Sequence, residues 1–247
     1  MIPIKSKEDL KMLKKSGKIL AEIMQRLKSS VKAGVSTLEI DELAQKLVDK
    51  EKALPAFKGY KGFPGNICAS INEEVVHGIP GPRRLKEGDI IGLDLGINYK
   101  GYFCDGAITV GVGRLASGTD RLIAVTKNAL LKGIERARVN NRLSDISYAI
   151  QTYVEKHGFS VVRQFVGHGI GHSLHETPEI PNFGRPHEGE LLKNGMVFAI
   201  EPMVNMGTWE CEILDNGWTA VTKDGMPSAH FEHTVAITDD GPQVLTD

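Results

Sequence analysis

The sequence contains few cysteines, few aromatic residues and no long apolar segment. Its three cysteines, Cys68, Cys104 and Cys211, are odd in number and widely spaced among 247 residues. This usage argues against a disulfide framework and favours a reducing compartment. No segment approaches the ~20 consecutive apolar residues that a membrane span needs, and the first residues lack a signal-peptide pattern. We therefore expect a cytoplasmic protein that does not enter a membrane.

The chain also lacks a strong net charge. Its 30 basic and 31 acidic residues give a formal net charge of −1, so we expect neither nucleic acid nor an anionic membrane as a specific partner. Lysines do cluster near the start. Because they alternate with apolar residues at helical spacing, they predict the solvated face of a helix. These lysines are Lys5, Lys7, Lys11, Lys14, Lys15 and Lys18.

The apolar content of 41% suits a globular protein with one large domain or two small ones. Apolar residues at helical spacing predict an amphipathic helix over residues 6–30. A second helix should begin at Ser36, because Ser36 and Glu39 match a capping box. Further helices are expected near 119–138 and 144–157, and a glycine-rich loop at 59–66. Strands are expected at 66–72, 89–95, 102–110, 196–205 and 228–237.

A weak internal repeat connects two parts of the chain. Residues 85–94 resemble residues 192–201, which superposes Asp94 on Glu201, and residues 40–50 resemble residues 146–156. The repeat predicts two helix–helix–strand halves, about 1–118 and 119–247, facing each other across a pseudo-twofold axis. Acidic residues far apart in sequence would then meet. The alternative is chance similarity between amphipathic helices and buried strands.

Four carboxylates and one histidine stand in apolar or glycine-rich segments: Asp94, Asp105, His168, Glu201 and Glu232. A lone buried carboxylate costs several kcal/mol, so each must be paired, protonated or bound to a metal. One histidine cannot pair four acids, whereas one or two divalent cations could. Oxygen donors with one imidazole suit Mn, Fe, Co, Zn or Mg. Asp94 and Asp105 alone could also be ordinary turn residues.

Histidines surround this set in the sequence. His168 and His172 have the i, i+4 spacing of a helical zinc motif, but the glycines between them argue against a helix. We expect a glycine-lined bend that presents His168 and His175 into a cleft, with His77 beside a turn. Residues 230–234 should form one strand, with His230 and Glu232 on the same side. Three other histidines are expected to be structural: His157, His172 and His187.

Five motifs occur in order along the chain: Asn-Glu-Glu-Val-Val-His-Gly-Ile-Pro at 72–80, the Asp94 and Asp105 pair, Gly-His-Gly-Ile-Gly at 167–171 with His-Glu at 175–176, Ile-Glu-Pro-Met at 200–203, and Glu-His-Thr at 232–234. Together they resemble type I methionine aminopeptidase over essentially the whole chain. The resemblance implies the α/β pita-bread fold, with a curved mixed or antiparallel sheet flanked by helices in one catalytic domain, 1–247. The long insertion of type II enzymes and an N-terminal zinc finger are absent from the sequence.

The resemblance also implies a ligand set for two divalent ions, with Co, Mn, Fe, Zn or Ni as candidates. Asp94 would bind one ion, and His168 and Glu201 the other. Asp105 and Glu232 would bridge both. Glu201 would in addition serve as general base and proton shuttle.

Substrate contacts are implied in the same way. His77 and His175 would hydrogen-bond the substrate amide and the developing oxyanion. A methionine side chain would pack in an apolar pocket, since a thioether packs well against aromatic edges. Family members often have a small residue or cysteine at position 57, tyrosine at 63 and phenylalanine at 174, which changes the pocket's shape but keeps it apolar. They often have arginine at 172, so His172 would remove a charge near the mouth of the site. Without the metal residues, an ordinary core cluster would be the simpler interpretation of the pocket positions. The pocket positions are Phe57, Tyr60, Phe63, Cys68, Leu174 and Trp218.

The implied function is removal of the initiator methionine from nascent proteins and peptides when the second residue is small. We expect a monomer that acts on nascent N-termini and contacts the ribosome transiently. Two alternatives stay open. One is a proline-specific peptidase of the same fold, although such relatives usually carry an additional N-terminal domain. The other is a non-catalytic pita-bread binding module, although such modules lose metal ligands and this chain keeps all five.

Overall fold

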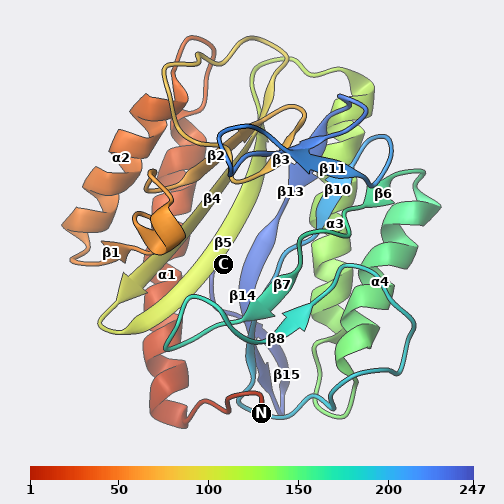
Figure 1. The fold of residues 1–247 in the computed structure, drawn as a ribbon. Helices are drawn as coiled ribbons and strands as arrows, with labels where there is room; N and C mark the ends of the chain where they lie inside the picture. The colour runs from red at the N-terminus through yellow and green to blue at the C-terminus, as the bar shows by residue number, and fades with distance from the viewer.

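The chain forms four α-helices, which flank a curved sheet in two pairs (Figure 1). The computed structural model describes residues 1–247 and places α1 at Lys7–Ser30, α2 at Thr37–Lys50, α3 at Ser117–Arg136 and α4 at Leu143–Lys156. Each helix lies where apolar periodicity predicted it. The predicted capping box at Ser36 is present, and Ser6 caps α1 in the same way. No helix is both long and apolar enough to cross a membrane.

The main sheet has nine strands in the order β1-β4-β5-β14-β9-β7-β8, with β15 paired to β14 and β2 paired to β4. All of these pairs are antiparallel. The predicted strands at 66–72, 89–95 and 102–110 correspond to β2, β4 and β5. The nine strands are β1 (Leu54–Pro55), β2 (Cys68–Ile71), β4 (Ile90–Tyr99), β5 (Tyr102–Gly111), β7 (Gly167–Gly169), β8 (Glu176–Ile180), β9 (Val197–Ile200), β14 (Glu232–Thr238) and β15 (Gly241–Val244).

Two small sheets adjoin the main one. The first has the order β13-β10-β6 and the second the order β11-β12-β3. A short 3₁₀ turn, η1 (Tyr60–Gly62), lies within the predicted loop at 59–66. The strands are β3 (Glu74–Val76), β6 (Ser160–Val161), β10 (Met203–Asn205), β11 (Cys211–Ile213), β12 (Ala220–Thr222) and β13 (Ser228–His230).

Two strands predicted as continuous are each divided, so those predictions were wrong in part. The run at 196–205 breaks at Glu201 and Pro202 into β9 and β10, and the run at 228–237 breaks at Phe231 into β13 and β14. Pro202 has no N–H with which to continue the ladder, and its carbonyl accepts a hydrogen bond from the N–H of Phe231 at 3.3 Å. The segments at 201–202 and 231 therefore leave the main sheet together. His230 pairs with Met203 in the small sheet, and does not share one strand with Glu232.

The apolar core is divided between the helix pairs. One cluster packs beneath α1 and α2 and includes Leu13, Leu20 and Leu27, which are fully buried. The other packs beneath α3 and α4 and includes Leu122 and Ile146. Burying such side chains stabilises the fold by about 1.5–3 kcal/mol each. The two clusters support the sheet from its helical side, which leaves the other face of β4, β5 and β14 available for polar residues.

Equivalent contacts recur in the two predicted halves. An isolated bridge joins Ser36 to Arg84, and a second joins Arg142 to Leu191 at the matching positions of the repeat. The N–H of Leu85 donates to the carbonyl of Val35, and the N–H of Leu192 donates to that of Asn141. These paired contacts support duplication. The division into halves at about residue 118 stays a prediction.

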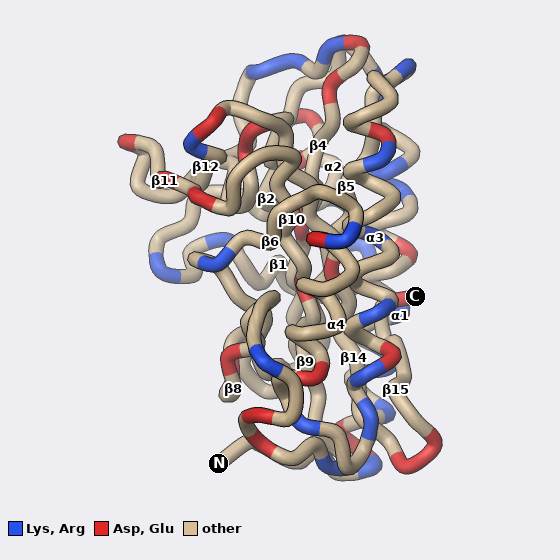
Figure 2. Tube along the Cα trace, turned by 90° about the vertical axis from the view of Figure 1, so that its right-hand side faces the viewer, with Lys and Arg blue, Asp and Glu red and all other residues tan.

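The lysines near the start do not all behave as predicted. Lys7, Lys11, Lys14, Lys15 and Lys18 are exposed on α1, as expected. Figure 2 shows basic and acidic residues interspersed along the chain. Lys5, however, precedes the helix and is only 5% exposed, so its assignment to a solvated helix face was wrong. Periodicity could not reveal its partner, which lies 171 residues away.

Candidate metal centre and substrate cavity

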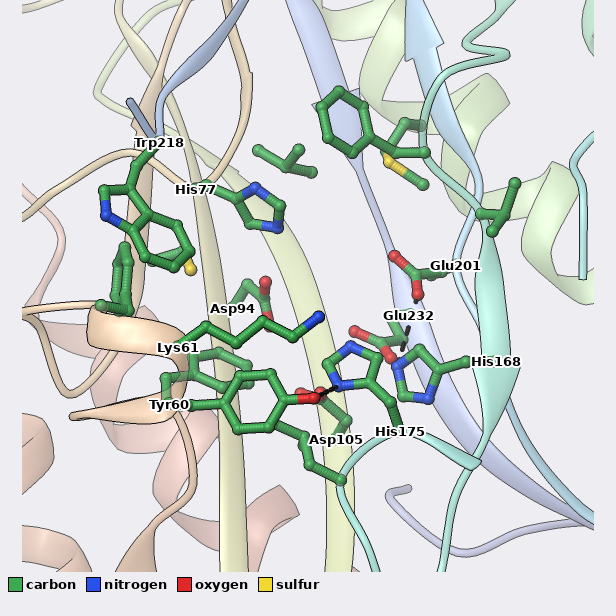
Figure 3. Close-up of a pocket in the computed structure, with 18 of the residues that line it drawn as sticks. Tyr60, Lys61, His77, Asp94, Asp105, His168, His175, Glu201, Trp218 and Glu232 are labelled. Atoms are coloured by element: carbon green, nitrogen blue, oxygen red, sulfur yellow. Dashed lines mark hydrogen bonds and ion pairs between the residues drawn. The ribbon is translucent and has the colours of Figure 1, made fainter. Parts of the chain in front are cut away.

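A cavity of about 300 Å³ lies where β4, β5, β7 and β14 meet (Figure 3). All thirteen site residues predicted from the sequence line it, so segments spread over most of the chain converge at one place. They are Phe57, Tyr60, Phe63, Cys68, His77, Asp94, Asp105, His168, Leu174, His175, Glu201, Trp218 and Glu232.

Strand register brings three of the acids together. Asp94 of β4 and Glu232 of β14 both lie opposite Ala107, one on each side of β5. Asp105 precedes Ala107 by two residues, so its side chain leaves the same face of the sheet. Neighbouring strands are about 4.8 Å apart. Three carboxylates therefore converge over three adjacent strands, with the small side chain of Ala107 between them.

Threonine hydroxyls hold this register from within the sheet. The N–H of Asp105 donates to Oγ1 of Thr234 at 2.9 Å, and that hydroxyl donates to the carbonyl of Asp105 at 2.8 Å. Thr109 makes the same pair of bonds with the main chain of His230, each at 2.8 Å. The backbone beside the acids is thus fixed by buried hydrogen bonds, which are electrostatically stronger in the low-dielectric interior than in water.

His168 lies in strand β7, so its predicted place in a glycine-lined bend was wrong. Residues 171–175 do form a bend, and both His168 and His175 line the cavity. The flanking glycines serve close strand packing: a Cβ at Gly167 would collide with the carbonyl of Ala199, and one at Gly169 with that of Thr177. The Nδ1–H of His168 donates to the carbonyl of Gly169 at 2.9 Å, which leaves the lone pair on Nε2. That nitrogen is 3.6 Å from Oε1 of Glu201.

Burial raises the pKa of all four acids, and the charges of neighbouring acids raise it further for Asp94, Glu201 and Glu232. Burial raises the pKa of Asp94, and the charges of Asp105 and Glu201 raise it further. Burial raises the pKa of Asp105 to about 7. Burial is also the main cause of the raised pKa of Glu201, and the charge of Asp105 adds to it. The pKa of Glu232 is raised mainly by burial and further by the charges of the other three acids. The protein itself provides too little positive charge here to keep four carboxylates ionised.

Several polar atoms of the cluster have no hydrogen-bond partner although they are buried. They include Oδ1 of Asp94, Oε1 of Glu232 and Nε2 of His230. Buried polar atoms are rarely left unpaired, and a bound ion is one of the few explanations. Burial lowers the pKa of His168, which keeps its imidazole in the neutral form that binds metals. The donor set of carboxylates and imidazole therefore fits divalent cations.

Two groups of donor atoms have the spacing of a metal site. Asp105, His168 and Glu232 form one group, and Glu201, His230 and Glu232 form the other, each with donor atoms within 4.8 Å of one another. Glu232 belongs to both groups. Asp94 belongs to neither group, although the charges of Asp105 and Glu201 are close enough to raise its pKa.

Sequence reasoning missed His230 as part of this cluster. The residue is 3% exposed, and its Nε2 is 3.6 Å from Oε2 of Glu201. Its spacing of two residues from Glu232 was a usable signal, but a strand break separates the two. The sequence also missed six further residues of the lining, namely Lys61, Val76, Gln164, Phe165, Val166 and Met203.

Aromatic and apolar side chains form the opposite wall of the cavity. The rings of Phe63 and Trp218 meet edge to face at 5.2 Å, and His77 packs against Trp218 at 6.4 Å. Gly96 of β4 has no room for a side chain, because the ring of Phe57 and a methyl group of Leu174 lie against it. The six predicted pocket residues thus line the same cavity as the acids.

His175 stands at the rim of the cavity, between Tyr60 and His168. Its Nδ1 is 2.9 Å from the hydroxyl of Tyr60, and its ring centroid is 4.2 Å from that of His168. Burial of its inner side, followed by the nearby charges of His168 and Lys61, lowers the pKa of His175 to about 3. The imidazole is therefore neutral at physiological pH. If Tyr60 donates to Nδ1, the proton of His175 is on Nε2.

A buried ion pair anchors the loop that carries His175. The ammonium of Lys5 binds Oε2 of Glu176 at 2.5 Å. The other carboxylate oxygen of Glu176 accepts hydrogen bonds from the N–H groups of His172 and Ser173, at 2.8 and 3.2 Å. The segment before α1 thereby positions the rim of the cavity. The histidines expected to be structural, His157, His172 and His187, do not line the cavity.

Comparisons with known proteins agree with this geometry. The model of metallopeptidase family M24 matches residues 11–239. Methionine aminopeptidase of Clostridium perfringens (strain 13 / Type A) is 51% identical over 246 residues, which cover 100% of this chain and 99% of that protein. The crystal structure of methionine aminopeptidase from Rickettsia prowazekii superposes with a TM-score of 0.99 at 42% identity, covering 100% of both chains.

Prolidase from Pyrococcus furiosus is more distant. It has a TM-score of 0.81 at 22% identity, and the match covers 99% of this chain and 65% of that one. This likeness shows the fold alone, and it confirms the predicted pita-bread fold with its curved antiparallel sheet and flanking helices. The chain therefore belongs to metallopeptidase family M24, in which it is a member of the type I methionine aminopeptidases.

Proposed function

We propose that the chain is a hydrolase that removes the initiator methionine from nascent proteins and peptides whose second residue is small. The observation that carries this proposal is the cavity itself, which joins a carboxylate and histidine cluster to an apolar, aromatic wall. The full-length likeness to methionine aminopeptidases favours this activity over that of a prolidase or of a non-catalytic module.

The metal ligands that we propose are Asp94, Asp105, His168, Glu201 and Glu232. Family membership implies divalent metal use. We propose two ions, shared through Asp105 and Glu232, and Glu232 indeed belongs to both groups of donor atoms. Divalent ions at this place supply Lewis acidity, which polarises a peptide carbonyl and makes water a usable nucleophile near neutral pH.

Glu201 is suited to move protons during hydrolysis. Burial and the neighbouring Asp105 raise the pKa of its carboxyl group, which makes the carboxylate, once ionised, a stronger base than an ordinary glutamate. The amide of Asn182 donates to the main-chain carbonyl of Glu201 at 3.0 Å, which fixes the point where the chain leaves β9. In our proposal Glu201 takes a proton from the attacking water and delivers it to the leaving amine.

Two neutral histidines face the reacting peptide bond in this proposal. His175 can donate its Nε2–H to the developing oxyanion, because Nδ1 is taken by Tyr60. Burial lowers the pKa of His77, so it too is neutral. His77 has a φ of +60°, which is uncommon for a residue other than glycine, and its ring is wedged against Phe165 and Trp218. It would hydrogen-bond the substrate amide.

Binding of the free α-amine of the substrate near Asp94 would explain action at a chain end. The methionine side chain would contact the wall of Phe63, Cys68 and Trp218. Burial, followed by the charges of Asp94 and Asp105, raises the pKa of the Cys68 thiol, which therefore stays neutral and suits a thioether. The free α-amine would lie near Asp94. A second residue must fit between the wall and the metal ligands, which favours a small side chain.

A peptide assay with and without a chelator tests the proposal. We expect release of methionine from Met-Ala-Ser in buffer with divalent metal, no release after chelation, and no cleavage of Ala-Pro. Cleavage of Ala-Pro alone would instead support a proline-specific peptidase. The absence of metal-dependent cleavage of either peptide would support a binding module. A cytoplasmic location, a monomeric state and transient ribosome contact stay predictions.

A further inference from the structure

Lys61 is the only lysine or arginine among the residues that line the cavity. Its neighbours there include the four acids of the proposed metal centre. Figure 3 shows its side chain extending across the cavity between Asp94 and Tyr60. The residue is exposed at the rim, and its Nζ is 5.5 Å from the centroid of the Tyr60 ring. Its ammonium forms no hydrogen bond or ion pair with the protein, so it is free to contact a ligand.

The turn that carries Lys61 has an unusual and well-defined backbone. Lys61 has a φ of +48°, between Gly59 at +82° and Gly62 at +91°. The N–H of Gly59 donates to the carbonyl of Phe63 at 2.8 Å, and the N–H of Phe63 donates to that of Tyr60 at 2.9 Å. A left-handed backbone is unfavourable for lysine, and it persists only because these contacts hold the turn. The turn thereby directs the lysine side chain over the cavity.

The charge of Lys61 acts on groups inside the cavity. Its ammonium is one of the charges that lower the pKa of His175, after burial and His168. Two divalent ions would neutralise the four carboxylates, and the histidines of the lining are neutral. The ammonium would then be the remaining charge beside the entrance. This step rests on the proposed function, because it assumes the metal-loaded site.

A substrate would place its residues in a fixed order along the cavity. The α-amine and the methionine side chain would occupy the inner end, and the residues after the small second residue would leave over the rim. Lys61 stands at that rim, beside His175. We propose that Lys61 is a specificity-determining residue, which favours peptides with an acidic residue directly after the small second residue and disfavours a basic residue there.

The test compares three peptides whose C-termini are amidated, so that no terminal carboxylate mimics an acidic side chain. They are Met-Ala-Asp-amide, Met-Ala-Lys-amide and Met-Ala-Ser-amide. For the wild-type enzyme loaded with metal at low salt, we expect kcat/KM to be roughly 3- to 10-fold higher for the aspartate than for the lysine peptide, as for a partly screened pair of charges. This preference should shrink in about 1 M salt, where the Debye length is ~3 Å.

Charge variants distinguish the effect of Lys61 on the rate ratio from the effect of the rest of the site. Lys61→Met removes the charge and keeps the length of the side chain, and it should bring the ratio of the two rates close to one. Lys61→Glu should invert the ratio. Lys58→Met is the matched control, because Lys58 is an exposed lysine of the same loop that does not line the cavity. It should leave the ratio at its wild-type value.

The outcomes distinguish this inference from the function on which it rests. If Met-Ala-Ser-amide releases methionine but the ratio is the same in wild type and Lys61→Glu, the role of Lys61 is overturned. An equal change in Lys58→Met would also overturn it, because the effect would then be one of general charge. If none of the peptides releases methionine in the presence of metal, the proposed function itself fails. Far-ultraviolet circular dichroism checks that the variants are folded.

Discussion

Replacing Glu232 with alanine is expected to abolish turnover and weaken metal binding while the fold is largely retained. Glu232 is shared by both groups of candidate metal donors, so its loss affects the whole centre. Its Oε1 has no hydrogen-bond partner that the variant would lose. Burial and the charges of Asp105, Glu201 and Asp94 raise the pKa of Glu232, so its removal also relieves repulsion in the metal-free protein.

The experiment combines three readouts on the purified variant: methionine release, metal content after dialysis, and the thermal unfolding midpoint without metal. Glu188→Ala serves as the matched control, since Glu188 is exposed and lies outside the cavity. Near-normal turnover of Glu232→Ala in metal-replete buffer would refute the shared role of this residue. If Glu232→Ala unfolds completely, Glu232→Gln takes its place in the experiment, because it keeps the size of the side chain. Glu232→Gln should also lose turnover.

Replacing His175 with alanine should lower kcat by roughly 10²–10³-fold, the usual cost of removing one donor to an oxyanion. The neutral imidazole at the rim, with Nδ1 engaged by Tyr60, presents its other nitrogen to the cavity. Because the interaction strengthens as charge develops on the substrate oxygen, KM should change less than kcat. Metal content should be unaffected, since His175 is not in either donor group.

His172→Ala provides a close comparison for this variant. His172 belongs to the same loop, but its ring faces Asp9 at 3.3 Å and does not line the cavity. Its replacement should leave kcat within a few-fold of wild type. An effect of His175→Ala on KM alone would assign His175 to substrate binding, and equal losses in both variants would indicate a general disturbance of the loop.

Much of this site could be predicted because its chemistry conflicts with its local sequence. Acids such as Asp94 and Glu201 stand within apolar runs, where only a bound cation or a proton makes them tolerable. The helices were predictable for a similar reason, since the apolar spacing in α1 and the capping box at Ser36 are local signals. Both kinds of evidence are contained within about a dozen neighbouring residues.

The features that escaped prediction depend on contacts distant in sequence. The breaks at Glu201 and Phe231 occur where two strands leave one sheet for another, which no single strand reveals. Lys5 resembled a surface lysine, because its partner Glu176 is far along the chain. Lys61 reaches the cavity from a left-handed turn, and His230 reaches Glu201 from the far side of the strand break at Phe231. In each case the tertiary fold, and not the local pattern, decides where the side chain points.

The central claim is that divalent metal is bound by Asp94, Asp105, His168, Glu201 and Glu232. Anomalous diffraction from crystals of the metal-loaded protein, recorded above and below the absorption edge of the added ion, tests it most directly. We predict two anomalous peaks within this cluster, with Asp105 and Glu232 contacting both ions. A fully loaded crystal with its peaks elsewhere, or with none among these five residues, would contradict the account.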